Sequence, residues 1–332
     1  MKVLVLGAAG MIGCKLTERL VRDGEVGGKK IAHLALADIV QAPAPPASFP
    51  IASGVFDLSR RGTAEELIAD RPELIFHLAA IVSGEAEADL EKGYRINFDG
   101  TRDLFEAIRR VDDYVPRVVF TSSLAVYGAP FPGVIPDDFH LTPLTSYGTQ
   151  KAMGELILSD YSRRGFLDGV GIRLPTICVR PGKPNRAASG FFSGIIREPL
   201  NGQKAVLPVP PTVRHWFASP RAAIGFLIQA AGLDASRLGA KRNLTMPGLS
   251  ATVEEQIEAL RDVAGNEAVA LIETQPDPAI AAIVGGWPEA FEAGRARDLG
   301  FRGDASFAEI IEIYRRDDMP GARASEAAGM AS

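Results

Sequence analysis

The sequence contains little cysteine and no long apolar run. Cys14 and Cys178 are its only cysteines among 332 residues, and they lie far apart. Two such residues are too few for a disulfide framework or a CxxC-type metal site, and they fit a reducing compartment. The longest apolar run falls short of the roughly 18 residues that a membrane span needs. These absences predict a soluble, cytoplasmic protein without a bound metal.

Excess positive charge is also missing. Lys and Arg number 36 against 41 for Asp and Glu, which gives a formal net charge of −5. A chain with this balance and no basic run is a poor ligand for nucleic acids and anionic membranes. Hydrophobic residues make up 46% of the chain, which excludes a disordered protein. The expected partner is therefore a small molecule.

Short apolar runs alternate with longer amphipathic runs in the first half of the chain. This alternation predicts α/β architecture, a Rossmann-like doubly wound parallel sheet covered on both faces by helices. The expected strands are Lys2–Leu6, Ile31–Ala37, Val55–Leu58, Leu74–Leu78, Val118–Thr121 and Val170–Val179. The expected helices are Met11–Arg22, Thr63–Ala69, Glu85–Val111 and Ser146–Arg164.

The regular alternation ends after Arg180. Helices are expected at about Phe191–Leu200, Pro220–Gly232, Val253–Val263 and Phe307–Arg315, and strands at Asn243–Met246 and Val269–Glu273. Thr252 with Glu255, and Ser306 with Glu309, have the spacing of capping boxes. We therefore predict an α/β domain at 1–180, a smaller substrate-binding cap mainly at 181–320, and a flexible tail at 321–332.

A glycine turn follows the first predicted strand directly. Gly7, Gly10 and Gly13 form G-x-x-G-x-x-G between a strand and a helix. Such a turn lets the backbone N–H groups at the helix start, here including Met11 and Ile12, approach a pyrophosphate, whose charge the helix dipole favours. In this context the motif predicts a dinucleotide site rather than simple helix packing.

Acidic residues at two strand ends indicate which dinucleotide binds. Asp38 ends the second predicted strand, where a carboxylate can accept both adenosine ribose hydroxyls and repel a 2′-phosphate. The cofactor is therefore predicted to be NAD. Asp57 and Leu58 follow the third predicted strand, where they could meet the adenine.

A tyrosine and a lysine lie four residues apart on one predicted helix. Tyr147 and Lys151 are one turn apart, so the ammonium can favour the phenolate and make the tyrosine a usable base. Tyr147 could then take the proton of a substrate hydroxyl while a hydride leaves. Hydroxyls at the end of a preceding strand could orient the reacting oxygen, and Thr121, Ser122 and Ser123 are all candidates.

Together these motifs resemble the extended short-chain dehydrogenase/reductase family. The resemblance also rests on His77-Leu78-Ala79-Ala80, on Asn97-x-x-Gly100-Thr101, and on a C-terminal segment at 295–301. It implies Ser123 as the hydroxyl orienter, Tyr147 as the acid/base, and Lys151 as a ligand of the nicotinamide ribose. It further implies that Leu78, Ala79 and Ala80 line the cofactor, that Asn97 supports the site, and that His77 is a buried strand residue.

The later segments resemble a branch of this family that oxidises small sugar acids. The residues concerned lie at 179–186, 193–200, 214–216 and 243–248. The resemblance implies NAD-dependent oxidation of a C4 sugar acid at its C2 hydroxyl. A carboxylate next to that hydroxyl needs a cation or a donor cluster. The candidates are Ser83, Thr176, Arg180, Lys183, Asn185, Arg214 and His215, of which Arg214 matches a substrate-contacting arginine of the wider family.

Two alternatives remain open from the sequence. One is an epimerase of nucleotide sugars that keeps its NAD bound, although the segment Pro175-Thr176 departs from the asparagine usual there. The other is an NAD-sensing protein without catalysis, although such proteins tend to lose the Tyr147/Lys151 pair. The family resemblance also implies a homodimer, formed through two long helices.

Overall fold

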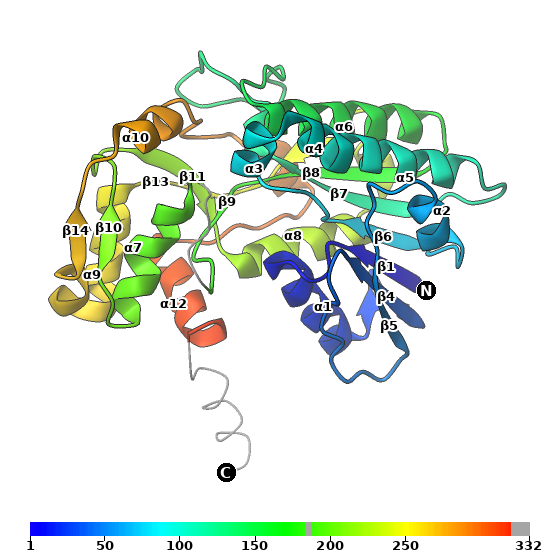
Figure 1. The fold of residues 1–332 in the computed structure, drawn as a ribbon, viewed down its shortest axis with the longest axis horizontal. Helices are drawn as coiled ribbons and strands as arrows, with labels where there is room; N and C mark the ends of the chain where they lie inside the picture. Colours follow the sequence, from blue (N-terminus) through cyan, green and yellow to red (C-terminus); the bar gives the residue numbers. More distant parts are fainter. Residues whose placement is uncertain (183–187, 320–332) are drawn as a thin grey trace, which may run out of the picture.

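The computed structural model describes residues 1–182 and 188–319. Lys183, Asn185 and the predicted tail at 321–332 lie outside the described residues. The described chain forms a seven-stranded sheet with helices on both faces, and a smaller body of helices and short sheets lies at one end of it (Figure 1). This is the predicted Rossmann-like α/β architecture with a smaller C-terminal part.

The large sheet is entirely parallel, with strand order β12-β8-β7-β6-β1-β4-β5. Its strands are β1 (Lys2–Leu6), β4 (His33–Asp38), β5 (Ile51–Val55), β6 (Leu74–His77), β7 (Arg117–Ser123), β8 (Asp168–Leu174) and β12 (Asn243–Thr245). From β1 the chain first extends the sheet through β4 and β5, then returns to β6 on the other side. The carboxyl ends of β1 and β6 thus meet at the point where the strand order reverses, which is where ligands of such sheets bind.

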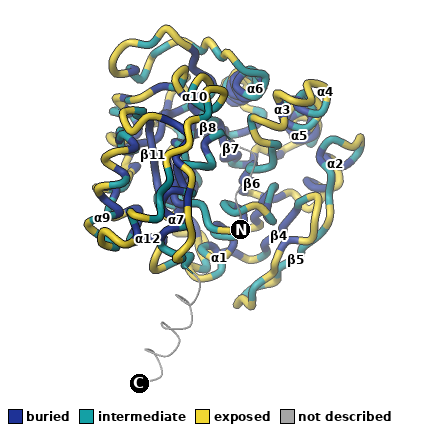
Figure 2. The backbone as a smooth tube through the Cα atoms, turned by 60° about the vertical axis from the view of Figure 1, so that its left-hand side comes forward, coloured by how far each residue is buried: buried dark blue, intermediate teal, exposed yellow. Residues whose placement is uncertain are grey.

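Helices cover the sheet in two layers, as Figure 1 shows. One layer contains α1 (Met11–Asp23) and α8 (Pro220–Gly232). The other contains α2 (Thr63–Ile68), α5 (Gly100–Arg109) and α6 (Ser146–Arg163), with α3 (Ser83–Ala88) and α4 (Leu90–Gly93) against α6. The side chains of β1 alternate between these layers, because Val3 and Val5 pack in one hydrophobic core and Leu4 and Leu6 in the other. The central strands of the sheet are therefore buried on both faces, whereas the edge strand β5 is partly exposed (Figure 2).

The smaller body has a core of its own. Its helices are α7 (Gly190–Leu200), α9 (Val253–Val269), α10 (Pro278–Gly285) and α12 (Phe307–Asp317), whereas α11 (Gly294–Asp298) contacts β12 and packs Ala296 into the core of the large sheet. Its strands are β9 (Thr176–Ile177), β10 (Ala205–Leu207), β11 (Arg214–Ala218), β13 (Leu249–Thr252) and β14 (Ile272–Thr274). Short elements complete the chain: β2 (Glu25–Val26), β3 (Lys29–Lys30), η1 (Tyr94–Asp99), η2 (Leu124–Val126) and η3 (Ala235–Arg237).

Two predicted strands were placed wrongly. The third strand is Ile51–Val55, so it ends at the residue where the predicted strand begins. As an edge strand it is half exposed, and its sequence lacks the apolar run that identifies a buried strand. Asn243–Thr245 does not belong to the smaller body, because it pairs in parallel with β8 at the edge of the large sheet. The 180/181 domain boundary remains a prediction.

Two long predicted elements are interrupted. The helix expected at Glu85–Val111 is broken at Asp89, whose backbone is extended (φ −134°, ψ 91°), and continues through the π-helical turn η1 into α5. The strand expected at Val170–Val179 ends at Leu174. Pro175 has no N–H for the ladder, and the chain then joins a different sheet as β9.

The four predicted later helices form, with differences at the end of α9 and at the cap of α12, and the structure adds α10 and α11. Helix α9 extends beyond Val263 to Val269, although Gly265 is not helical, and β14 therefore begins at Ile272. Thr252 and Glu255 form the predicted capping box. At α12 only half of the box forms: Ser306 accepts from the Glu309 N–H, but the Glu309 carboxylate accepts from Ala305 instead of Ser306.

Candidate active site

The turn between β1 and α1 is too tight for side chains. Gly7 has φ +83°, and a Cβ built on it would lie 2.7 Å from the Ala79 nitrogen. A Cβ on Gly13 would lie 2.2 Å from the Gly7 carbonyl oxygen. Helix α1 then begins at Met11 with Gly10 as its N-cap, which offers no side-chain cap to the first-turn N–H groups. Those donors fit the pyrophosphate of a dinucleotide.

Asp38 lies against this turn. Its carboxylate accepts hydrogen bonds from the N–H groups of Ala9, at 2.9 Å, and of Ile39, at 2.7 Å. The strand end and the glycine turn are therefore joined by the residue expected to bind the adenosine ribose. Next to it, Ile39 is 68% exposed and presents an apolar surface beside that position.

The other two residues expected near the adenine have structural contacts. Oδ1 of Asp57 accepts from the backbone N–H and the hydroxyl of Ser59, at 2.9 and 2.6 Å. Leu58 is buried against Gly100. A Cβ built on Gly100 would lie 3.2 Å from the Leu58 Cγ. These contacts hold the loop after β5 against α5.

Asn97 holds the loop that follows β6. Its side chain accepts from the Ile81 N–H at 2.8 Å, donates to the Ile81 carbonyl, and donates to Gln150 Oε1 at 2.8 Å. The loop contains Leu78, Ala79 and Ala80, which lie at the carboxyl edge beside the glycine turn. Asn97 therefore acts as a support, as the resemblance implied. Its partner Gln150 was missed by sequence reasoning.

His77 is a buried core residue, as expected. Its Nε2 lies 2.8 Å from the Thr101 hydroxyl, which itself donates to the Asn97 carbonyl, so His77 is the donor to Thr101. Burial, and secondarily the charge of Lys151, lowers the pKa of His77 to about 3. The imidazole is therefore neutral and does not act as an acid or a base near neutral pH.

Ser123, Tyr147 and Lys151 converge at the carboxyl ends of the strands. Ser123 ends β7 and hydrogen-bonds the Tyr147 phenol. Tyr147 and Lys151 lie one turn apart on α6, whose N-cap Thr145 accepts from the Gly148 N–H. The Lys151 ammonium donates to the Thr121 carbonyl at 2.8 Å and lies 5.8 Å from the centre of the Tyr147 ring. Of the three candidate hydroxyls, it is that of Ser123 that contacts the phenol.

Burial and nearby polar and charged side chains set the electrostatics at Tyr147. Burial raises the pKa of the Tyr147 phenol, while the hydrogen bond from Ser123 and the positive charge of Arg180 lower it. The Lys151 ammonium, which is expected to favour the phenolate, lies 5.8 Å from the Tyr147 ring centre, donates to the Thr121 carbonyl and lies over the Phe120 ring. Burial also lowers the pKa of Lys151 to about 8, so part of its population is neutral above neutral pH.

Arg180 is a second cation, and its charge lowers the pKa of the Tyr147 phenol. It is largely buried, with Nε donating to the Ile177 carbonyl and a terminal nitrogen donating to the Ser189 hydroxyl. Its charge acts on both Tyr147 and His215. Arg180 therefore belongs to the same group of side chains as the phenol, although sequence reasoning ranked Arg214 higher.

Thr176 and His215 form a pair in this region. The Nδ1 of His215 lies 3.1 Å from the Pro288 carbonyl, which can only accept, so Nδ1 carries the proton. Burial lowers the pKa of His215 to about 4, so the ring is neutral and its Nε2 accepts from the Thr176 hydroxyl at 2.7 Å. The oxygen of Thr176 keeps its acceptor capacity.

The remaining two substrate candidates lie apart from each other. Ser83 begins α3, which packs against the same helix as Tyr147. Arg214 begins β11, where it donates to Ser250 and forms an ion pair with Glu255 at 3.2 Å. The Arg214 guanidinium is therefore bound to the cap of α9, not to the group around Tyr147.

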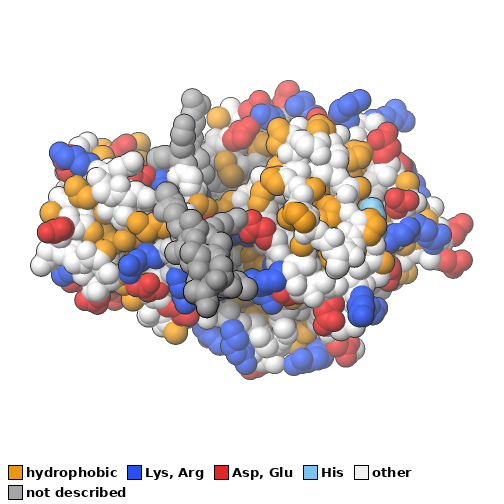
Figure 3. All heavy atoms as spheres, turned by 90° about the horizontal axis from the view of Figure 1, so that it is seen from below, with side chains coloured by type: hydrophobic (Ala, Val, Ile, Leu, Met, Phe, Trp, Pro, Cys, Tyr) orange, Lys and Arg blue, Asp and Glu red, His pale blue; other side chains and the backbone are white. Residues whose placement is uncertain are grey.

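Within residues 1–182 and 188–319, no helix is both long and apolar enough to cross a bilayer. In the same residues, no cluster of three or more His, Cys, Asp or Glu side chains could hold a metal ion. On the face drawn in Figure 3, acidic and basic side chains are interspersed.

A glycine turn for a pyrophosphate, an acid for a ribose, and a Ser-Tyr-Lys group define a nucleotide-dependent oxidoreductase of the Rossmann type. The family model described as "NAD dependent epimerase/dehydratase family" matches residues 3–216. The chain belongs to this family, and its cofactor is NAD.

Three relatives align over nearly the whole chain. A D-erythronate dehydrogenase of Cupriavidus necator is 48% identical over 96% of this chain and 98% of its own. A D-erythronate dehydrogenase of Haemophilus influenzae is 40% identical over 96% of this chain and 100% of its own. A crystal structure described as a nucleoside-diphosphate-sugar epimerase from Agrobacterium tumefaciens is 62% identical, covers 97% and 95% of the two chains, and superposes with a TM-score of 0.95.

Proposed function

We propose that this protein is a D-erythronate dehydrogenase, which oxidises the C2 hydroxyl of D-erythronate to give 2-dehydro-D-erythronate. The observation that carries the proposal is that Tyr147 and Lys151 meet Ser123 at the carboxyl ends of the strands, with the positive charge of the partly buried Arg180 acting on the phenol. A sugar acid has its carboxylate next to the reacting hydroxyl, so a base and a fixed cation must lie close together. The two full-length relatives described as D-erythronate dehydrogenases support the same assignment.

Each side chain has one task in this reaction. Ser123 holds the C2 oxygen, and the Tyr147 phenolate takes the proton of the C2 hydroxyl. Lys151, placed against the Thr121 carbonyl, contacts the nicotinamide ribose. Arg180 binds the substrate carboxylate, with Ser83 and Thr176 as further polar contacts. NAD, when bound, supplies the acceptor for the C2 hydride.

Net reduction of the cofactor tests the proposal. The purified protein is incubated with NAD and D-erythronate, and NADH formation is followed by its absorbance. We expect stoichiometric conversion of the acid and NADH release. The second candidate is the nucleotide-sugar epimerase that the Agrobacterium relative's description names. Turnover of UDP-glucose without net NADH formation, together with no reaction with D-erythronate, would favour that function instead.

Replacing Arg180 by Met should separate the two candidate arginines. Losing a charge-assisted contact costs about 1.5–3 kcal/mol, so the KM for D-erythronate should rise roughly 10- to 100-fold. The acid limb of the pH profile of kcat/KM should move to higher pH, because Arg180 lowers the pKa of Tyr147. Steady-state kinetics from pH 6 to 10 measure both effects.

Arg214→Met is the matched control for that experiment. Arg214 contacts Ser250 and Glu255, so its loss should weaken the cap of α9 and lower the melting temperature with little change in KM. A large KM effect confined to Arg214→Met would assign the substrate carboxylate to Arg214 and remove Arg180 from that role.

The proposal also includes a cellular location and an oligomeric state. We infer a cytoplasmic enzyme, since Cys14 and Cys178 are both free thiols. We also infer a homodimer through α5 and α6, the two long helices that the family resemblance places at a dimer contact.

A further inference from the structure

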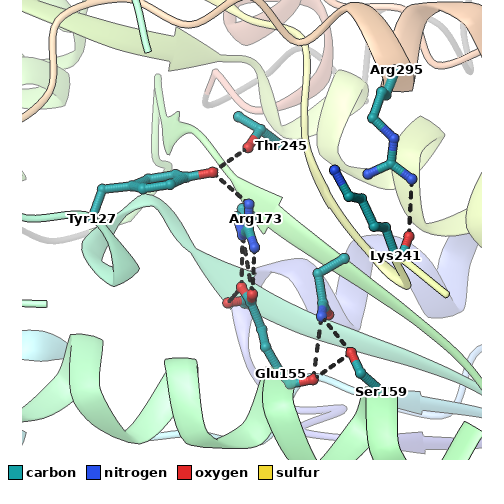
Figure 4. Close-up of polar contacts among 9 residues, drawn as sticks. Tyr127, Glu155, Ser159, Arg173, Lys241, Thr245 and Arg295 are labelled. Carbon is teal, nitrogen blue, oxygen red and sulfur yellow. Dashed lines mark hydrogen bonds and ion pairs between the residues drawn. The ribbon is translucent and has the colours of Figure 1, made fainter. Parts of the chain in front are cut away.

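A buried ion pair joins α6, the helix that contains Tyr147 and Lys151, to strand β8 (Figure 4). Glu155 on α6 and Arg173 on β8 pair in a bidentate contact, with N–O distances of 2.6–3.1 Å, and their side chains are only 1% and 9% exposed. The Ser122 hydroxyl donates to Glu155 at 2.5 Å. This carboxylate therefore connects α6 to both β7 and β8, the strands beneath the active site.

Arg173 is held from its other side as well. It donates to the Tyr127 hydroxyl, which also contacts the Thr245 hydroxyl at 2.9 Å (Figure 4). Thr245 belongs to β12, and the Tyr127 ring packs 5.5 Å from the ring of Phe291. The Arg173 guanidinium is thus committed to fixed partners, and it in turn fixes the Glu155 carboxylate.

Lys151 lies one helical turn before Glu155 and is also buried, at 2% exposed. The titratable groups around the ammonium are Tyr147 and Glu155 on its own helix and His77 on β6. His77 is neutral, and Tyr147 must become anionic only during the reaction. Glu155 lies one turn from Lys151 on the same helix, and its charge opposes the loss of the Lys151 proton.

We propose that Glu155 is a positioning residue of the reaction: its carboxylate, clamped by Arg173, keeps the Lys151 ammonium charged and in place beneath Tyr147. The inference rests on the cofactor contact that the proposed function gives Lys151. Burial alone lowers the pKa of Lys151, and Glu155 opposes that shift. Without Glu155 the ammonium would lose its proton at lower pH, and Arg173 would remain as an uncompensated buried cation.

The pH dependence of NADH binding tests this role without any substrate. NADH affinity of the wild-type protein should fall as pH rises through about 8, where Lys151 loses its proton. In Glu155→Gln the midpoint should lie about one pH unit lower. At pH 8 the Kd should then be about fivefold weaker than in the wild type, whereas at pH 6 the two should nearly agree. Fluorescence titration at each pH gives the Kd.

A second variant keeps the test valid if Glu155→Gln folds poorly. Glu155→Gln with Arg173→Met removes both buried charges, a replacement that folded proteins often tolerate. Its midpoint should lie between those of the wild type and Glu155→Gln, because the carboxylate that supports the Lys151 charge is gone but so is the uncompensated Arg173 cation. Asp168→Asn is the matched control. Asp168 pairs with Arg117 and Arg242 at the amino end of β8, so its loss should lower stability without moving the midpoint.

Two results would overturn the inference: a wild-type affinity that does not change around pH 8, or a midpoint that stays in place in folded variants lacking Glu155. Failure of the proposed function looks different. Wild-type protein that makes no NADH from D-erythronate, while its NADH binding shifts with Glu155 as described, would refute the substrate assignment and support the role of Glu155.

Discussion

Tyr147→Phe is expected to lower kcat for D-erythronate oxidation by about 10²- to 10⁴-fold, the range over which general base catalysis contributes. The phenylalanine ring fills the same space on α6 but cannot take the proton of the C2 hydroxyl. It also removes the hydrogen bond with Ser123. The phenol acts when the proton leaves the C2 hydroxyl, which is in the transition state and not on substrate binding. KM should therefore change far less than kcat. Steady-state kinetics with NAD and the acid measure both constants.

A control for this variant lies on the same helix. Tyr161 also carries its hydroxyl on α6, but it donates to Glu106 on α5, away from the site. Tyr161→Phe should therefore keep its turnover, and both variants should bind NADH as the wild type does. Wild-type turnover in Tyr147→Phe would eliminate the phenol as the base and favour another acid/base.

Lys151→Met is expected to lose cofactor affinity and turnover together. Methionine nearly matches the lysine stem but has no ammonium, so the Thr121 carbonyl loses its donor and the nicotinamide ribose loses its contact. A hydrogen bond to a charged group is worth about 1.5–3 kcal/mol, so the Kd for NADH should rise roughly 10- to 100-fold. The dependence of the Kd on pH near 8 should disappear with the titrating group.

Lys204→Met is the control for this variant. It removes a lysine from an exposed pair with Glu273, far along the chain from the site, and should leave the Kd for NADH and the turnover unchanged. If Lys151→Met lost turnover yet bound NADH at wild-type strength across the pH range, the ribose contact would be wrong and Lys151 would act on Tyr147 alone.

The buried strands and the cofactor turn could be predicted from the sequence because their causes are local. β1 is apolar on both faces since helices cover both, and the glycines follow it directly. The spacing of Tyr147 and Lys151 is likewise a property of one helix. The edge strand β5 left no such signal, because half of its surface faces solvent and its composition is mixed.

Contacts between distant segments could not be predicted in the same way. The break at Asp89 and the π-helical turn after it interrupt a run whose periodicity suits a continuous helix. The turn contains Asn97, whose hydrogen bonds to Ile81 and Gln150 stabilise the irregular backbone. The Glu155–Arg173 pair left one usable signal, an acid four residues after Lys151 on the buried face of α6, but its partner lies on another strand.

The position of β12 has a consequence for how the chain is made. Residues 1–174 contain the other six strands of the large sheet, yet α8 and β12 are encoded later. A nascent chain released only to β8 exposes the open backbone edge of that strand and the apolar sheet face that α8 later covers. During synthesis the nucleotide-binding half must therefore wait, protected from aggregation, until about 70 further residues have left the ribosome at the usual 5–20 residues per second.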